Sequence, residues 1–147
     1  MQIVLSDAFD IEDPFQGHRD LNCPLYIRMN GTAFPYEEWD EMAVTVIYWW
    51  IGQAAQGLEK FNLRFMEGPY WIECSRKGEM VHLACINDRF TRYVACEEEI
   101  EMRTLLDELR KAAVWLVRQV ERHGWNDIND FEYLKNYANY LEGKNQS

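Results

Sequence analysis

Residues 36–58, YEEWDEMAVTVIYWWIGQAAQGL, decide the fold because their apolar side chains recur at helical spacing. One apolar stripe consists of Trp39, Met42, Ala43, Val46, Ile47, Trp50 and Ala54. A second, neighbouring stripe consists of Val44, Tyr48, Ile51 and Ala55. A helix that is apolar nearly all round is buried on more than one side. The sequence therefore predicts a buried central helix from Tyr36 to Leu58.

The start, the interior and the end of this helix carry signals of their own. Pro35 suits a first helical turn, and Glu37 and Glu38 place negative charge near the positive end of the helix dipole. Gly52 costs about 1 kcal/mol relative to Ala inside a helix, so we expect another backbone to cross closely there. Gly57 is expected to form a left-handed cap.

Residues 61–86 form the clearest β pattern in the chain. A hairpin around Lys77 and Gly78, with Ser75 opposite Met80, separates the apolar side chains from the polar ones. The expected core face carries Phe61, Leu63, Phe65, Tyr70, Ile72, Cys74, Val81, Leu83 and Cys85. The opposite face carries Asn62, Arg64, Met66, Trp71, Glu73, Ser75, Met80, His82 and Ala84. Either a helix covers this second face or it is an exposed recognition patch.

The N-terminal part predicts two short strands joined by a loop. Residues 2–5 and 24–29 have strand character, and Asn30-Gly31 is a typical turn dipeptide. Residues 6–22 are acidic and lack clear periodicity, so we expect a loop there.

The C-terminal part predicts a short strand and two helices. The strand covers residues 90–94, and Glu97 or Glu98 opens a long helix whose apolar stripe runs over residues 102–120. Gly124 is its expected cap. A last helix spans about 127–141, with Phe131, Leu134, Ala138 and Leu141 facing inward, and residues 143–147 are expected to fray. These elements together predict an α+β fold: an antiparallel meander of about four to six strands packed against about three helices.

The size and charge of the chain limit its organisation and its partners. With 147 residues, 48% of them hydrophobic, it is expected to form a single domain over 1–147. It contains 25 Asp and Glu against 15 Lys and Arg, for a formal charge of −10. Such a field repels nucleic acid and anionic lipid and speeds encounter with a basic partner, so we expect neither nucleic-acid nor membrane binding.

Other features of the sequence predict the cellular location of the protein and the redox state of its cysteines. No apolar run approaches the roughly 20 residues of a membrane span, and residues 1–13 lack the pattern of a secretory signal. We therefore expect a cytoplasmic protein. The four cysteines, Cys23, Cys74, Cys85 and Cys96, form no CxxC motif, which favours buried thiols over disulfides or zinc ligands. We expect no metal and no cofactor.

Four segments also resemble, in their order, a known family. They are the N-terminal β region, the helix with EEWDEMAVTVIYWW (37–50), the meander FNLRFMEGPYWIECSRKGEMVHLACIND (61–88) and the closing long helix. This layout, with the acidity, resembles the small immunity proteins encoded beside bacterial polymorphic or contact-dependent toxins. The resemblance implies a non-enzymatic protein that binds and blocks a cognate toxin domain. It assigns no site residues, because the contact surface differs between subfamilies.

The residues themselves suggest how such a protein binds. Acidic clusters would steer a basic, nuclease-like toxin, and aromatic side chains would anchor it. The expected partner-binding residues are Glu37, Glu38, Asp40, Glu41, Arg64, Trp71, Glu73, His82, Glu97, Glu98 and Glu99, with the acidic N-terminal loop as an additional source of charge.

Two other functions remain open at the level of sequence. The first is a small ligand-binding domain or enzyme, which would use Glu73 and His82 as an acid and base pair or an aromatic pocket. The pocket candidates are Trp39, Trp49, Trp50, Tyr70 and Phe65. The second is a regulatory protein that mimics the charge of nucleic acid, which would present its carboxylates in a regular array.

Overall fold

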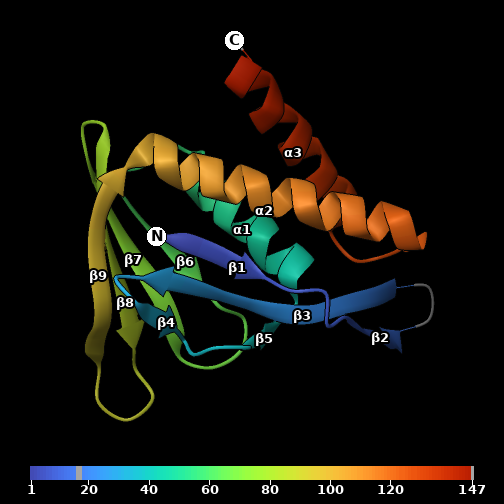
Figure 1. Cartoon of the computed structure of the whole chain (residues 1–147), viewed down its shortest axis with the longest axis horizontal. Coiled ribbons are helices and arrows are strands. Elements are labelled where there is room, and N and C mark those ends of the chain that lie inside the picture. Colours follow the sequence, from blue (N-terminus) through green and yellow to red (C-terminus); the bar gives the residue numbers. More distant parts are fainter. Residues whose placement is uncertain (16–17, 147) are drawn as a thin grey trace.

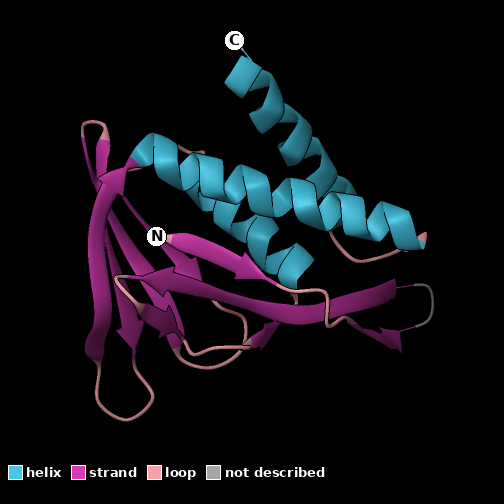
Figure 2. Cartoon of the chain, viewed as in Figure 1, coloured by secondary structure: helices cyan, strands magenta, loops and turns pink. Residues whose placement is uncertain are grey.

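The computed structural model describes residues 1–15 and 18–146 and has an α+β fold with antiparallel sheets. In these residues the elements follow one another as β1 (Gln2–Leu5), β2 (Asp10–Phe15), β3 (His18–Met29), β4 (Thr32–Phe34), β5 (Asp40–Glu41), α1 (Ala43–Ala54), β6 (Lys60–Arg64), β7 (Tyr70–Lys77), β8 (Met80–Asn87), β9 (Tyr93–Glu101), α2 (Met102–His123) and α3 (Phe131–Gln146) (Figure 1). The helices lie together on one side of the strands (Figure 2).

The strands form two sheets, where the sequence predicted one meander. In the five-stranded sheet, β3 is the common strand and pairs with β1, β2, β4 and β5. The four-stranded sheet is a meander in the order β6, β7, β8, β9. The two sheets contact each other at several points. At the tip of the turn between β3 and β4, for example, the Asn30 side-chain amide donates to the Glu97 carbonyl oxygen at 2.8 Å.

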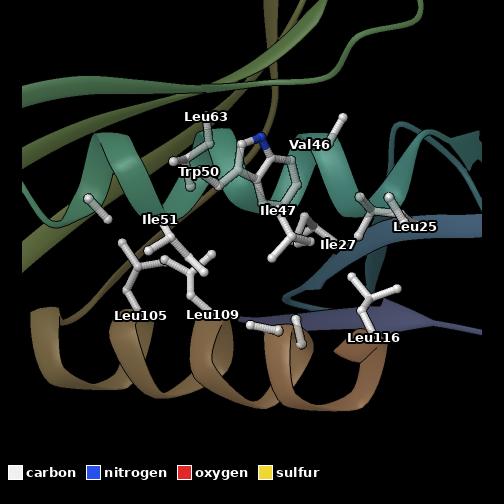
Figure 3. Packing of buried hydrophobic residues seen from close by; sticks show 14 of the residues in the cluster. Leu25, Ile27, Val46, Ile47, Trp50, Ile51, Leu63, Leu105, Leu109 and Leu116 are labelled. Carbon is white, nitrogen blue, oxygen red and sulfur yellow. The ribbon is translucent and has the colours of Figure 1, made fainter. Parts of the chain in front are cut away.

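Helix α1 is the buried centre of the fold, as predicted. It contacts β3, β6, α2 and α3. Trp50 and Ile51 are both fully buried. Figure 3 shows the side chains of α1 packed between those of β3, β6 and α2.

The predicted start of this helix at Tyr36 is wrong, because α1 begins at Ala43. Glu38 has φ of 61°, outside the helical region, and Asp40–Glu41 forms β5, which pairs with Cys23 and Pro24 of β3. The acidic residues therefore precede the helix in a turn and a strand and do not occupy its first turn.

The predictions for the two glycines of this region are also revised. A Cβ built on Gly52 would meet only the Tyr137 hydroxyl, at 3.8 Å, which is an ordinary contact, so no backbone crosses closely there. Gly57 has the predicted positive φ, 74°, but it lies beyond the helix, which ends at Ala54 and is capped by Ala55.

The predicted loop over residues 6–22 is largely a β-hairpin of β2 and β3. Residues 16–17 lie outside the described residues. Strand β3 starts well before the predicted residue 24, because its N-terminal half pairs with β2 while its C-terminal half pairs with β1 and β4. The apolar pattern of residues 6–22 is irregular, so it predicted neither β2 nor the N-terminal half of β3.

The meander has the predicted faces, but the hairpin register differs by two residues. Ser75 lies opposite His82, and Met80 lies opposite Lys77, because the chain turns through a two-residue loop with Gly78 at φ 62°. Since side chains alternate with period two, an even shift leaves each paired residue on its predicted face. Met66, predicted for the opposite face, lies beyond β6 and packs partly buried against the core. The pairing of Leu63 with Ile72 is as predicted.

Strand β9 replaces the predicted helix start at Glu97 or Glu98. It continues to Glu101, and α2 begins at Met102. The apolar stripe of α2 is buried, and Gly124 forms the predicted left-handed cap with φ 70°.

Helix α3 begins at Phe131, four residues later than predicted. Ile128 is buried and forms an isolated bridge with Arg19 of β3, and the residues around it form turns, so the chain before α3 is not helical. The predicted inward stripe of α3 is buried, and α3 continues to Gln146 instead of fraying from residue 143; Ser147 lies outside the described residues. No helix in the described residues is long and apolar enough to cross a membrane.

Candidate functional site

The candidate site is the outer face of the four-stranded sheet, which we define as the side of β6–β9 opposite the core. Directly opposed residues of neighbouring strands share a face, so the register fixes which side chains belong to it. The outer face consists of Lys60, Asn62, Arg64, Trp71, Glu73, Ser75, Lys77, Met80, His82, Ala84, Ile86, Val94, Glu97, Glu99 and Glu101. Of these, Ile86, directly opposite Trp71, is buried.

This face is exposed and is not a second layer of the core. Ser75, His82 and Glu99 are exposed in the middle of the face, and Trp71 and Met80 are half-buried. Of the two arrangements left open by the sequence, the exposed patch is therefore the one observed.

Two arginines lie over the ring of Trp71. The Arg64 guanidinium carbon is 5.2 Å from the ring centroid, and that of Arg92 is 5.5 Å away. Arg92 also donates to the Glu73 carboxylate at 2.8 Å. The indole thus makes cation–π contacts with two guanidinium groups, one of which is also paired with Glu73.

Glu73 and His82 do not form the acid and base pair considered from the sequence. Glu73 lies opposite Ala84, and His82 lies opposite Ser75. The His82 Nε2 atom is 3.0 Å from Glu97 Oε2, while Glu73 binds Arg92. In the observed register the two residues do not lie opposite each other. Glu73 binds Arg92, and His82 contacts Glu97.

Strand β9 adds a row of carboxylates along the edge of the outer face. Glu97, Glu99 and Glu101 alternate with Glu98 and Ile100, so the first three point outward and are exposed. Across the sheet, β6 carries Lys60 and Arg64, so the face changes from basic at β6 to acidic at β9.

Glu98 does not belong to this row. It lies opposite Leu83 on the core side, and its carboxylate accepts a hydrogen bond from the N-terminal amine of Met1 at 2.8 Å. Its position therefore connects the N-terminus to β9 and places Glu98 outside the outer face.

The other predicted acidic cluster is not part of the outer face. Glu37, Glu38 and Asp40 are exposed before α1, and Glu37 forms an ion pair with Arg28 at 3.2 Å. They remain available for steering, but they are attached to the five-stranded sheet through β5.

Glu41 is fully buried and serves the structure. Its carboxylate accepts hydrogen bonds from the Trp39 indole N–H at 3.0 Å and from the backbone N–H groups of Met66 and Glu67 at 3.3 and 3.0 Å. Burial raises the pKa of this carboxyl, and the three hydrogen bonds partly oppose the rise. Glu41 thus links β5 to the turn between β6 and β7 through hydrogen bonds.

The sequence interpretation did not place Lys60 on the outer face, and it missed Arg92, whose guanidinium contacts Trp71 of that face. Arg92 lies in the loop before β9, where no periodic pattern places it. The sequence favoured Glu97 to Glu101 as steering charges at a helix start, although the alternation of Glu97, Glu99 and Glu101 is also the pattern of a strand with one acidic face.

The aromatic pocket candidates divide between the core and an open groove. Trp39, Phe65 and Tyr70 pack against one another or against neighbouring rings in the interior. A groove of about 660 Å³ is lined by Tyr48, Trp49, Trp50, Gly52, Gln53, Gln56, Lys60, Phe61, Asn62, Arg64 and Tyr137. Trp49 is 43% exposed there, and Trp50 is buried.

In the described part of the chain, no three His, Cys, Asp or Glu side chains are arranged to hold a metal ion. The outer face combines cations on β6, carboxylates on β9 and the half-buried Trp71 between them. Comparison of the chain with protein-family models, with curated proteins and with solved structures finds no significant match.

Proposed function

We propose that this protein is a non-enzymatic binding protein that uses the outer face to bind a basic protein partner, as an immunity protein binds and neutralises a cognate bacterial toxin in the cytoplasm. The observation that carries the proposal is the combination, on one face, of Trp71 in contact with two arginines and a row of carboxylates on β9. Interfaces are enriched in tryptophan and arginine at their centre and polar at their rim.

The two parts of this face have different roles in binding. The carboxylates of β9 attract a basic surface over a distance of about one Debye length, roughly 8 Å at physiological salt. They speed encounter, while Trp71 supplies contact area after docking. The overall charge of −10 adds to the attraction of a basic toxin such as a nuclease.

Charge reversal on β9 tests the steering role. The triple variant Glu97→Lys, Glu99→Lys, Glu101→Lys is expected to lower the association rate constant for a partner isolated by pull-down by about tenfold or more at low salt. The difference from the unchanged protein is expected to shrink as salt rises, because exposed charges are screened. Stopped-flow fluorescence or surface plasmon resonance measures both.

The matched control reverses three exposed acids outside the outer face, Glu37→Lys, Glu38→Lys and Asp40→Lys. It changes the net charge by the same amount. The proposal predicts a smaller loss of association rate for this control than for the β9 variant. Equal losses would show that total charge, and not the outer face, steers the partner; rates that respond to neither charge nor salt would refute steering altogether.

A second candidate function is supported by the groove beside α1. Its volume, about 660 Å³, is in the range of small-molecule sites, and its lining combines exposed Trp49 with the cations Lys60 and Arg64 and no Asp or Glu. A ligand with a flat ring and a negative group would suit this lining. Gly52 leaves the groove open, because it has no side chain.

Filling the groove separates the two functions. Gly52→Leu is expected to displace a small molecule that native mass spectrometry detects on the purified protein, and Trp71→Ala on the outer face is expected to leave it bound. If no small molecule accompanies the purified protein and Gly52→Leu leaves partner binding unchanged, the groove has no part in function.

A further inference from the structure

Three of the four cysteines lie on the core side of neighbouring strands. Cys74 is on β7, Cys85 on β8 and Cys96 on β9, whereas Cys23 is on β3 of the other sheet. All four are free thiols. Cys85 and Cys96 are directly opposed in the pairing of β8 with β9, so their side chains leave the sheet on the same side at the same level.

A directly opposed antiparallel pair satisfies the backbone requirement for a disulfide. The Cα atoms of such a pair are about 4.5 or 5.5 Å apart, depending on the hydrogen-bonding pattern. Both separations fall within the range of roughly 4.4–6.8 Å found for disulfides. Cys74 lies opposite Leu83 and is therefore diagonal to Cys85, which is less favourable for bonding.

The two thiols differ in access and in acidity. Cys85 is fully buried, and Cys96 is half-buried on the edge strand, next to an irregularity in the pairing between Cys85 and Ile86. The hydrogen bond between the two thiols lowers the pKa of Cys96, and it raises the pKa of Cys85, as burial also does. Cys96 is thus the thiol that an external reagent reaches first, and it is the more acidic of the two.

We propose that Cys85 and Cys96 form a redox-sensitive thiol pair that is oxidised to a cross-strand disulfide by a small disulfide such as oxidised glutathione. The Cys96 thiolate attacks one sulfur of the reagent, forming a mixed disulfide and releasing one glutathione thiolate. The Cys85 sulfur then attacks Cys96 Sγ and expels the second glutathione. The two electrons pass to the reagent, and the protons of the two cysteine thiols end on the two released glutathione molecules.

The oxidised bond would fix β9 to β8 at the start of the carboxylate row. It closes a short loop over residues 85–96, so it restricts the unfolded chain and is expected to raise the melting temperature. The assignment stands without the proposed partner, because it depends only on the pairing of β8 with β9.

Thiol counting and peptide mapping test the pair in the full chain. After incubation of the native protein with oxidised glutathione, two of the four thiols are expected to be lost, and the linked peptides are expected to contain Cys85 and Cys96. Cys23→Ser, the matched control, is expected to form the same bond. Cys85→Ala is expected to stop at the mixed disulfide, visible as glutathione added to Cys96.

Mapping of the unchanged protein decides the question even if a cysteine variant fails to fold. Retention of all four thiols, or a bond involving Cys23 or Cys74, would overturn the proposal. Removal of the bond by dithiothreitol, with return of the original melting temperature, would confirm that the change is reversible.

Discussion

Trp50→Ala is expected to lower the free energy of unfolding by about 3–5 kcal/mol, the range for removal of a buried large aromatic side chain. Trp50 is fully buried on α1, and its ring packs edge-on to Phe65 at 5.2 Å. Its indole N–H donates to the Arg64 carbonyl oxygen at 2.7 Å, so the truncation leaves that carbonyl without this donor. The melting temperature should fall by roughly 6–20 °C in a chain of this size.

The neighbouring tryptophan provides the control. Trp49 is 43% exposed in the groove, so Trp49→Ala is expected to cost far less than Trp50→Ala in the same denaturant titration. Trp50→Phe keeps most of the buried ring area but lacks the N–H donor, so its loss of stability should be intermediate. Similar losses for Trp49→Ala and Trp50→Ala would contradict the position of α1 at the centre of the fold.

Helical periodicity predicted the cores of the helices well because it depends only on local geometry. The stripe of α2 and the inward residues of α3 were found from spacing alone. The starts were missed because acidic residues that suit a helix N-terminus also suit other positions. Glu41 is used in tertiary hydrogen bonds to the turn at Met66 and Glu67, which lie 25 and 26 residues further along the chain, and no local pattern reports such contacts.

The segment over residues 97–101 shows a second limit. Four glutamates in five residues match the first turn of a helix, and they also match a strand with one acidic face. The strand is observed because Ile100 lies opposite Val81, and Cys96 opposite Cys85, which completes the core face of the sheet. This pairing is decided by a neighbouring strand, so the residues of β9 alone could not reveal it.

The outer face was partly predictable for a similar reason. Strand alternation placed Arg64, Trp71 and Glu73 together, and this result survived an error of two residues in the hairpin register. The same error produced the false pairing of Glu73 with His82. Opposed residues are predicted correctly only with the exact register, whereas the face of a side chain is predicted correctly after any even shift. Arg92 was not predicted because it lies in a loop, where side chains follow no periodic pattern.

Glu41→Ala is the second substitution with a large expected effect. It leaves the Trp39 indole N–H and the backbone N–H groups of Met66 and Glu67 without their acceptor. Each unsatisfied buried donor costs about 1–3 kcal/mol, and loss of the buried charge offsets part of the sum, so we expect destabilisation of about 2–4 kcal/mol. Glu37→Ala, at an exposed position of the same segment, serves as the control and is expected to have little effect.

The pH dependence of Glu41→Gln tests the state of the buried carboxyl. Because burial raises the pKa of Glu41 above its usual value of 4.5, the folded protein holds the proton more tightly than the unfolded chain does. The stability from this proton is fully present below pH 4.5 and is lost as the pH rises through the pKa of the folded state. Gln resembles the protonated carboxyl and does not titrate.

The difference in unfolding free energy between the unchanged protein and Glu41→Gln is therefore expected to be larger near pH 4 than near pH 7. Denaturant titrations at a series of pH values measure it, with Glu37→Gln as the exposed control. A difference that grows as the pH rises would mean that the three hydrogen bonds to the carboxylate outweigh the cost of its burial. In that event the turn between β6 and β7 would be held by a fully ionised Glu41, and its pKa would lie below 4.5, contrary to the effect of burial described above.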